Sequence, residues 1–230
     1  MNDFLEAAGK EWDKIRSRPS LKSALSYIWD YYSLWIVGIA AGLITISYLA
    51  WHSLFMPKEN WFYITFTNTF EEIGTGSRLW EDYLEFTGFD LKTKNVVFDN
   101  SSYFDYKKGA IGNSYYEAFV AHVEAGTLDA VTAEKDSLIA LGSTGRLLDL
   151  NRPEAAEIKA KYGERFLYTE PYDKDYGVQE VPVGIDLSDS RLAREYGLYG
   201  EGGCALGVGA YSKNLEAVEL FLDFILGEGQ

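Results

Sequence analysis

Few side chains in this sequence have the chemistry of a nucleophile, a general base or a metal ligand. The chain has two histidines, His52 and His122, and one cysteine, Cys204. His122 falls on the expected inward face of a helix, which favours a core or boundary histidine, and no motif pairs a histidine with Cys204. The sequence contains no Gly-x-Ser-x-Gly elbow, His-Glu-x-x-His pair, phosphate-binding loop or calcium-binding loop. We therefore expect a protein that is not an enzyme and that holds neither a metal nor a cofactor.

Carboxylates are the most abundant charged groups in the sequence. The chain has 35 Asp and Glu against 21 Lys and Arg, which gives a net charge of −14. Two facing carboxylates can act as acid and base on a glycosidic bond, so a carboxylate-based envelope hydrolase stays open as an alternative. The acidic balance excludes nucleic acid as a partner, because contact with phosphates needs a basic face. It also disfavours attraction to anionic lipid headgroups. A single cysteine excludes an internal disulfide, so the folded part must be stabilised by its hydrophobic core.

Residues 31–56 contain no Asp, Glu, Lys or Arg, and they separate an arm, residues 1–30, from a domain, residues 57–230. A helix over this run is long enough to cross a hydrocarbon core of about 30 Å. A cleaved signal peptide has a shorter apolar core and a small-residue cleavage site, so we expect a retained signal anchor. Basic residues concentrate in the arm, which predicts a cytoplasmic N-terminus and an extracytoplasmic domain. The lack of disulfides favours a bacterial cell membrane.

Two further features concern what the anchor region contacts. Gly38 and Gly42 form a Gly-x-x-x-Gly pair that allows a second span to approach closely, so a homodimer through the span is a candidate. The arm has apolar residues at helical spacing and charged residues opposite, which predicts an amphipathic helix that lies on the inner leaflet or docks on a partner. These apolar residues are Phe4, Leu5, Ala8, Trp12 and Ile15.

Beyond the anchor, strand and helix patterns alternate. Short β-branched or aromatic runs predict strands, and runs with one apolar face predict helices, several of them ending at glycine. Residues 151–180 are polar and predict connecting structure. The β-α-β-α-β-α order predicts a single doubly wound, mostly parallel sheet with helices on both faces. The expected strands are 61–66, 95–98, 129–132, 181–185 and 205–210, and the expected helices are 72–87, 114–125, 134–142 and a last one after residue 210.

Several stretches of the domain, in this order, resemble the extracellular solute-binding proteins of ABC importers. One stretch is similar to a helix followed by Ala-Gly-x-x-Asp-Val, and another to the family's Gly-x-Leu-x-x-Leu passage. Two more resemble the strand that leaves the first lobe and the closing strand and helix. These stretches are residues 117–131, 136–139, 145–150, 176–183 and 207–226. The resemblance implies a periplasmic-binding-protein-like fold, a membrane transporter as partner and a ligand held at the sheet.

The chain also departs from that family. Solute-binding proteins have two α/β lobes that clamp the ligand between them. Here only about twenty residues separate the exit-like strand, which ends near Asp186, from the closing strand at Ala205, and they cannot build a second lobe. We therefore expect one lobe with a short bridge at residues 187–203, in which the glycine-rich stretch 200–203 is flexible. A single lobe offers a half-site that is open to water on one side, which disfavours tight capture of a small solute.

In an open α/β sheet, ligands bind at the carboxyl ends of the parallel strands. The resemblance makes the polar and aromatic residues after the first three expected strands the ligand-facing positions. The same residue types also serve as helix caps and turns, and Glu134 and Asp136 are equally suited to cap the helix that follows them. The predicted ligand-binding residues are Asn68, Thr69, Phe70, Asn100, Ser101, Tyr103, Tyr115, Glu134 and Asp136.

The sequence thus predicts a single-pass, membrane-anchored binding or accessory protein with one solute-binding-like lobe outside the cell. We expect the lobe to dock on a membrane partner, such as an importer permease or another receptor. Three alternatives stay open: a weak solute receptor completed by dimerisation, the carboxylate-based hydrolase, and a structural scaffold. A docking role predicts an exposed apolar or aromatic patch on the lobe.

Overall fold

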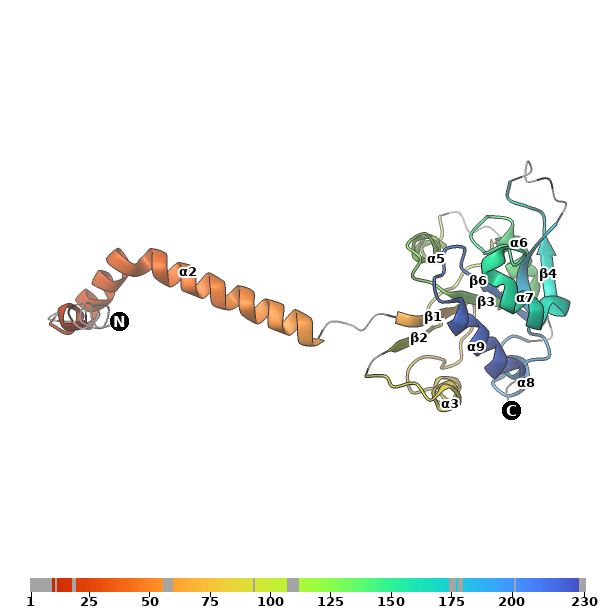
Figure 1. Ribbon diagram of the computed structural model, residues 1–230, viewed down its shortest axis with the longest axis horizontal. Coiled ribbons are helices and arrows are strands. Elements are labelled where there is room, and N and C mark those ends of the chain that lie inside the picture. The colour runs from red at the N-terminus through yellow and green to blue at the C-terminus, as the bar shows by residue number, and fades with distance from the viewer. Residues whose placement is uncertain are drawn as a thin grey trace. The chain divides into compact units, whose positions relative to one another are not determined.

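The computed structural model describes residue 10 and residues 12–17, 20–55, 60–92, 94–106, 112–173, 177, 180–200 and 202–227. The chain divides into two compact units, Met1–Pro57 and Lys58–Gln230, close to the expected boundary at residue 57. Figure 1 shows the elements of each unit. The predicted apolar face of the arm includes Phe4, Leu5 and Ala8, which lie outside the described residues. Trp12–Arg16 are helical, as expected.

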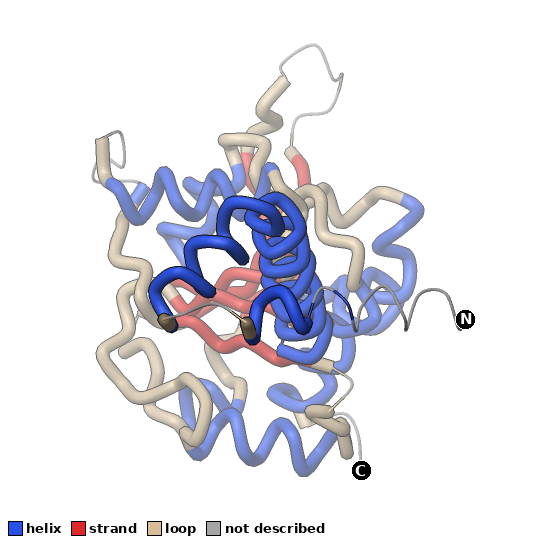
Figure 2. Tube along the Cα trace, turned by 90° about the vertical axis from the view of Figure 1, so that its left-hand side faces the viewer, coloured by secondary structure: helices blue, strands red, loops and turns tan. Residues whose placement is uncertain are grey.

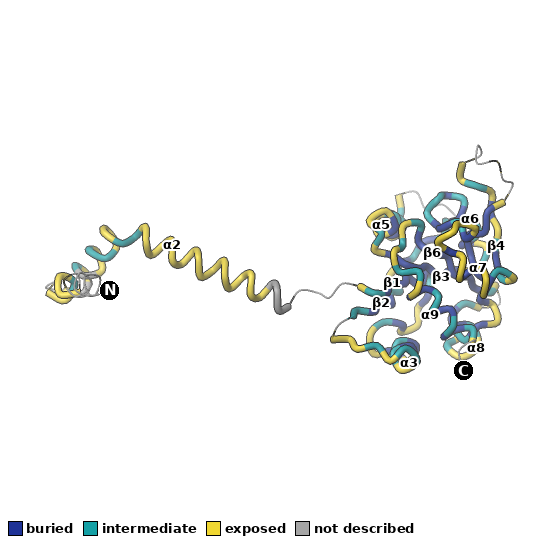
Figure 3. Tube along the Cα trace, viewed as in Figure 1, coloured by how far each residue is buried: buried dark blue, intermediate teal, exposed yellow. Residues whose placement is uncertain are grey.

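The first unit is dominated by one long helix, α2 (Leu21–Phe55). Its stretch Leu25–Trp51, of 27 residues with a mean hydropathy of 1.9, is long and apolar enough to cross a membrane, and none of it is buried within the chain. A helix of this kind serves as a membrane anchor or as a signal sequence. It begins ten residues before the start of the uncharged run at residue 31, because charged side chains such as Lys22 and Asp30 do not interrupt a helix. Most of α2 is exposed (Figure 3), and a Cβ added at Gly38 or Gly42 would meet nothing within 4 Å, so both glycines have an open face.

The second unit is an α/β fold around one mixed six-stranded sheet. Its order is β2-β1-β3-β6-β5-β4. The pairs β1·β2 and β1·β3 are parallel, whereas β3·β6, β6·β5 and β5·β4 are antiparallel. The strands are β1 (Asn60–Phe66), β2 (Asn95–Asp99), β3 (Ala130–Glu134), β4 (Phe166–Thr169), β5 (Val181–Asp186) and β6 (Cys204–Val208).

The expectation of a mostly parallel sheet is therefore wrong for half of it. The parallel part consists of the first three strands, each of which follows the one before through a helix or long loop. The other strands alternate in direction: β6 returns from β5 through the bridge at residues 187–203, and β4 and β5, which are consecutive strands, pair directly in antiparallel fashion. The sequence pattern did not predict β4, because a four-residue strand inside a polar stretch has almost no periodic signal.

Helices cover both faces of the sheet, as Figure 2 shows for the elements above and below the strands. One core cluster lies under α3, α7, α8 and α9, and the other lies under α5 and α6. Alternate residues of a strand contribute to opposite clusters, as Ala130 and Val131 of β3 do. The helices are α3 (Arg78–Thr87), α5 (Ser114–Glu124), α6 (Lys135–Gly142), α7 (Ala156–Tyr162), α8 (Arg191–Arg194) and α9 (Leu215–Leu226), with short 3-10 turns at Pro153–Ala155 and Gly163–Arg165.

Local chemistry sets the ends of α3. The Ser77 hydroxyl accepts the Trp80 amide at 3.2 Å as an N-cap, and Gly88 ends the helix at a φ of 64°. The expected start at residue 72 is six residues too early because Gly74 and Gly76 precede this cap. On the other face, α5 buries Phe119 and Val123, so His122, which the sequence placed inward, is exposed instead.

Candidate functional site

One edge of the sheet collects most of the predicted ligand-binding residues. The strands β1, β2 and β3 end there, and so does β5, because β5 and β3 are both antiparallel to β6. The loops that follow β1 and β2, together with the start of α6, therefore meet at this edge, as the sequence predicted. We call it the strand-end edge. The residues at this edge differ in whether their side chains are exposed to a ligand or are used in hydrogen bonds within the fold.

Asn68 connects two loops through hydrogen bonds. Its backbone has a φ of 57°, its amide N–H donates to the Ser102 carbonyl at 3.0 Å, and its side-chain Nδ2 donates to the Phe104 carbonyl at 2.8 Å. Both bonds join the loop after β1 to the loop after β2. The donor groups that the resemblance assigned to a ligand at Asn68 are thus used within the fold.

Asn100 and Ser101 have similar structural roles. The Asn100 Nδ2 donates to the Glu71 carbonyl at 2.7 Å, and the Ser101 amide donates to the Asp99 carboxylate at 3.0 Å. Thr69 is only 5% exposed, and its hydroxyl is buried without a hydrogen-bond partner among the described residues. These three residues shape the edge, and Thr69 is covered by its neighbours.

The aromatic residues of the prediction form a cluster of their own, which we call the aromatic surface: Phe70, Tyr103 and Tyr115. The rings of Phe70 and Tyr103 stack with centroids 5.4 Å apart and an interplanar angle of 30°. Tyr115 meets Tyr103 edge to face at 5.7 Å. Phe70 is 87% exposed and Tyr115 is 45% exposed, so the stack faces solvent. The Tyr103 hydroxyl donates to the Thr69 carbonyl at 3.2 Å, which fixes its ring.

The loop and helix beneath the aromatic surface are firmly connected. Asn113 is the N-cap of α5, where its Oδ1 accepts the amides of Tyr115 and Tyr116, and its Nδ2 donates to the Tyr103 carbonyl at 3.1 Å. A single amide side chain thereby couples the position of Tyr103 to that of Tyr115. The exposed rings are consequently held in place before any partner arrives.

The two predicted carboxylates at the end of β3 lie at the start of α6. Glu134 is exposed and occupies the N-cap position, but its side chain makes no capping hydrogen bond, so the capping interpretation is wrong for Glu134. Asp136 lies in the first turn of α6. Between them, Lys135 reaches Asp186 at the end of β5, with Nζ and Oδ2 2.5 Å apart. No sequence pattern predicts this pair, because the two residues follow different strands and are far apart in the chain.

The bridge at residues 187–203 packs against the sheet. Leu187, Leu192 and Leu198 are buried in the core cluster under α8 and α9. A Cβ added at Gly203, whose φ is 69°, would lie 2.3 Å from the Ser188 hydroxyl, so Gly203 is closely packed, whereas a Cβ at Gly200 or Gly202 would meet nothing within 4 Å. The bridge is thus anchored in the core by its own apolar residues, while the flexibility expected of residues 200–203 stays a prediction.

Tyr199 of the bridge covers the end of β3. Its backbone adopts a φ of 63°, unusual for a tyrosine, and its hydroxyl lies 2.8 Å from the Thr132 hydroxyl and donates to the Thr132 carbonyl at 2.9 Å. Burial raises the pKa of the Tyr199 phenol. The expected half-site, open to water at this strand end, is therefore partly filled by the chain itself.

No known protein family, curated protein or solved structure matches this chain. The function therefore has to be argued from the geometry.

Catalytic arrangements are not evident in the described ranges. They contain no group of three or more His, Cys, Asp or Glu side chains placed to hold a metal ion. Burial raises the pKa of the Cys204 thiol to about 12, which leaves it protonated at neutral pH. The His122 Nδ1 lies 3.1 Å from the hydroxyl of its neighbour Thr127, and its ring meets that of Tyr63 edge to face at 5.3 Å.

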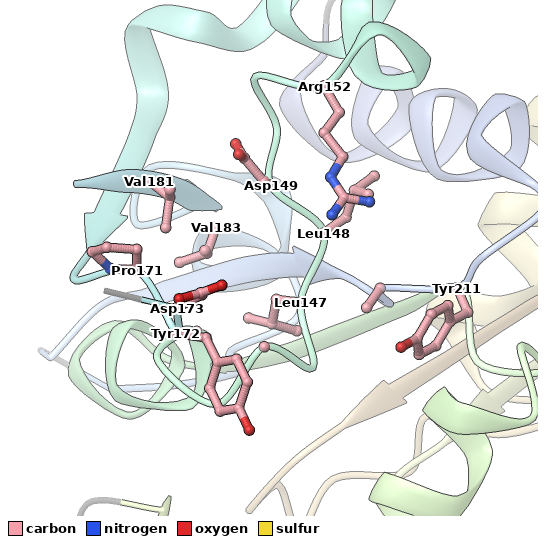
Figure 4. A pocket seen from close by; sticks show the side chains of 13 residues that line it. Leu147, Leu148, Asp149, Arg152, Pro171, Tyr172, Asp173, Val181, Val183 and Tyr211 are labelled. Carbon is pink, nitrogen blue, oxygen red and sulfur yellow. The ribbon is translucent and has the colours of Figure 1, made fainter. Parts of the chain in front are cut away.

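A cavity of about 210 Å³ lies away from the strand-end edge, where β4 ends and β5 begins (Figure 4). Its floor is apolar, and Tyr172 and Tyr211 flank it with Arg152 nearby. None of the predicted ligand-binding residues lines it. Sequence reasoning missed this cavity because its lining comes from five separate segments, among them Leu147–Asp149, Pro171–Asp173, Val181 and Val183.

The Lys135–Asp186 pair leads to a pH-dependent prediction. Partial burial by itself raises the pKa of Asp186, but hydrogen bonds from Lys135 and Ser188 outweigh it and lower the pKa below the usual value of 3.8. A lowered pKa contributes stability that is present above the unfolded-state value and is lost as the pH falls through the folded-state value. Because both side chains are about 30% exposed, we expect Lys135→Met to lose at most about 1 kcal/mol at pH 7.

The measurement is urea unfolding of wild type and Lys135→Met at pH 7 and at pH 3. The difference between the two proteins should shrink at pH 3, since this pH lies below the unfolded-state pKa of 3.8 and closer to the lowered folded-state pKa of Asp186. An equal difference at both pH values would show that Lys135 acts through packing and not through its charge.

Proposed function

We propose that this chain is a single-pass, membrane-anchored binding protein that is not an enzyme and whose lobe docks on a membrane protein through the aromatic surface. In this proposal the N-terminus is cytoplasmic and the lobe lies outside a bacterial cell membrane. The observation that carries the proposal is the exposure of Phe70, 87%, in a stack with Tyr103. An exposed aromatic patch on an acidic surface is typical of a protein interface.

The rigidity beneath the patch supports docking. The aromatic side chains have few torsions to freeze, and Asn68 and Asn113 hold their loops through side-chain hydrogen bonds. A patch that is already ordered loses little conformational entropy when a partner covers it. Phe70 and Tyr115 have the character of interface anchors, because large aromatic side chains dominate the energetics of many interfaces.

The sheet order supports the resemblance to a solute-binding lobe. In a two-lobe protein the chain leaves the first lobe by one strand and returns by another, so both strands must end at the edge that faces the second lobe. Here β5 ends and β6 begins at the strand-end edge, the two strands are antiparallel neighbours, and only residues 187–203 connect them. We infer a lobe whose partner lobe has been replaced by the bridge.

Tyr199 favours docking over solute capture. Its hydroxyl forms hydrogen bonds with the hydroxyl and the carbonyl of Thr132 in β3. These groups are then not available to a bound solute. The alternative, a weak receptor completed by dimerisation, is favoured by the open faces of Gly38 and Gly42 on α2. In that case the second copy would provide the missing wall. One experiment separates these two functions.

A photo-crosslinking amino acid is placed at position 70 of the full-length chain in its native membrane, and at position 168 in a control. Tyr168 is a suitable control because it is 47% exposed but lies on β4, at the far side of the sheet. Docking predicts an adduct with an integral membrane protein at position 70 and none at position 168. An adduct between two copies of this chain would support the dimeric receptor instead.

Substitutions then test the surface itself. The double variant Phe70→Ser, Tyr115→Ser should reduce recovery of the crosslinked or co-purified partner about tenfold or more, as expected for interface anchors. The matched control Tyr168→Ser, Tyr211→Ser changes two other exposed aromatic side chains and should leave recovery unchanged. Equal recovery with both variants would overturn the proposed function.

A further inference from the structure

A second feature of the lobe is a hollow of about 530 Å³ that opens where β1 and β2 begin, at the opposite end of these strands from the aromatic surface. We call it the lysine hollow. It brings together the first residues of β1, the loop before β2, the turn after α5 and the residues before α9. Its lining residues are Asn60, Trp61, Lys94, Ala125, Gly126, Thr127, Lys213 and Asn214.

Two cations line this hollow, Lys94 and Lys213. The Lys94 ammonium lies over the rings of Trp61 and Phe89, 4.4 Å and 4.9 Å from their centroids. Neither Lys94 nor Lys213 has an ion pair with a carboxylate among the described residues, whereas Lys135 and Lys161, for example, do. In a chain with a net charge of −14, two unneutralised lysines in one hollow mark a place for an anion.

The position of the hollow in the chain indicates the source of the anion. Only residues 56–59 separate the end of α2 from Asn60, and an extended chain spans at most about 3.6 Å per residue. If α2 spans the membrane, Asn60 is therefore within about 18 Å of the end of that helix. Trp61, whose ring packs edge to face on Phe89, is of the residue type enriched at membrane–water interfaces.

We propose that the lysine hollow receives the phosphate of an anionic phospholipid headgroup. The inference rests on the membrane anchor of the proposed function, but it does not depend on the aromatic surface. The headgroup phosphate lies between the ammonium groups of Lys94 and Lys213, and its acyl chains stay in the bilayer. The contact holds the lobe at the membrane surface while the opposite, aromatic edge stays available to a partner.

The acidic net charge does not oppose this local contact. The Debye length is about 8 Å at physiological ionic strength, so carboxylates on distant parts of the lobe are screened from the headgroup. Lysines within that distance of the surface decide the interaction, and each contributes about 1 kcal/mol, or about fivefold in local association. The sequence-based expectation of no attraction to anionic lipid rests on the average charge of the chain, whereas the lysine hollow is a local feature of one face.

The test uses the full-length chain in nanodiscs of neutral phosphatidylcholine, or of phosphatidylcholine with 30% phosphatidylglycerol. An amine-reactive acetylating reagent labels the lysines, and mass spectrometry gives the labelling rate of each one. We expect Lys94 and Lys213 to be labelled about fivefold more slowly in the anionic nanodiscs than in the neutral ones. Lys159, which is exposed and bonds Asn151, should be labelled at equal rates in both.

Two variants show whether the lysines act together. Lys94→Gln should restore fast labelling of Lys213 in anionic nanodiscs, and 0.5 M NaCl should do the same for the unchanged chain. The matched control Lys159→Gln should leave the protection of Lys94 and Lys213 intact. Loss of protection in the control variant would overturn the assignment to this hollow.

Three further outcomes would each overturn a different part of the proposal. Protection by soluble glycerol phosphate in neutral nanodiscs would identify a site for a free anion and overturn the lipid assignment. Equal labelling in both nanodiscs would overturn the inference while leaving the aromatic surface untouched. A chain that fails to insert into nanodiscs at all would overturn both the headgroup site and the membrane anchor.

Discussion

Replacing Phe221 by alanine is expected to destabilise the lobe by about 3–5 kcal/mol, the usual cost of removing a fully buried phenylalanine. Phe221 of α9 is 0% exposed and lies among the rings of β1, β2 and α3. Its centroid is 5.4 Å from that of Phe62 and 5.6 Å from those of Tyr83 and Phe98. These rings join three elements, so the cavity cannot be closed by moving one side chain.

Urea unfolding of the full-length chain in a non-ionic detergent, followed by near-ultraviolet circular dichroism, measures this loss. Phe70→Ala is the matched control, because it makes the same chemical change at a residue that is 87% exposed. We expect it to change the free energy of unfolding by less than about 0.5 kcal/mol. A similar loss for both variants would mean that Phe70 is part of the core and would remove the basis of the docking proposal.

Asp129→Ala is expected to lose about 2–4 kcal/mol, because it leaves several hydrogen-bond donors without an acceptor. Asp129 is 1% exposed and lies directly before β3. Its carboxylate accepts three hydrogen bonds: from the Tyr63 backbone N–H at 2.9 Å, from the Ser212 hydroxyl at 2.7 Å and from the Asn214 side-chain Nδ2 at 3.2 Å. It therefore ties β1 to the segment that leads into α9. Asp90→Ala, at an exposed aspartate that accepts the Lys92 amide, is the control and should lose less than about 1 kcal/mol.

The loss at Asp129 should depend on pH with the opposite sign to that at Lys135. Burial raises the pKa of Asp129 above 3.8, and its hydrogen bonds only partly offset this. A raised pKa means that the folded state binds the proton more tightly, so stability from this group falls as the pH rises through the folded-state pKa. The difference between wild type and Asp129→Ala should thus be larger near pH 4 than at pH 7. A difference that grows toward pH 7 would contradict this assignment.

The strands and helices with strong periodic patterns were predictable. The expected strand at residues 61–66 is β1 (Asn60–Phe66), and that at residues 95–98 is β2 (Asn95–Asp99), since aromatic and β-branched residues dominate both. The predicted site residues are also close together, because carboxyl ends of parallel strands meet at one edge. Their roles were not predictable, because an asparagine that binds a ligand and one that ties two loops, such as Asn68, are the same residue type.

The sequence by itself determined the properties that depend on neighbouring residues: the long apolar helix α2, the alternation of strands and helices, and the acidic charge. Tertiary structure alone decided the strand order and which side chains meet, because these features depend on residues that are distant in the chain. It placed β6 antiparallel between β3 and β5, brought Tyr199 onto Thr132, and left Phe70 exposed on Tyr103. It also gathered Lys94 and Lys213 in one hollow. Local pattern fixes which segments form elements, whereas the packing of their apolar faces fixes which side chains meet.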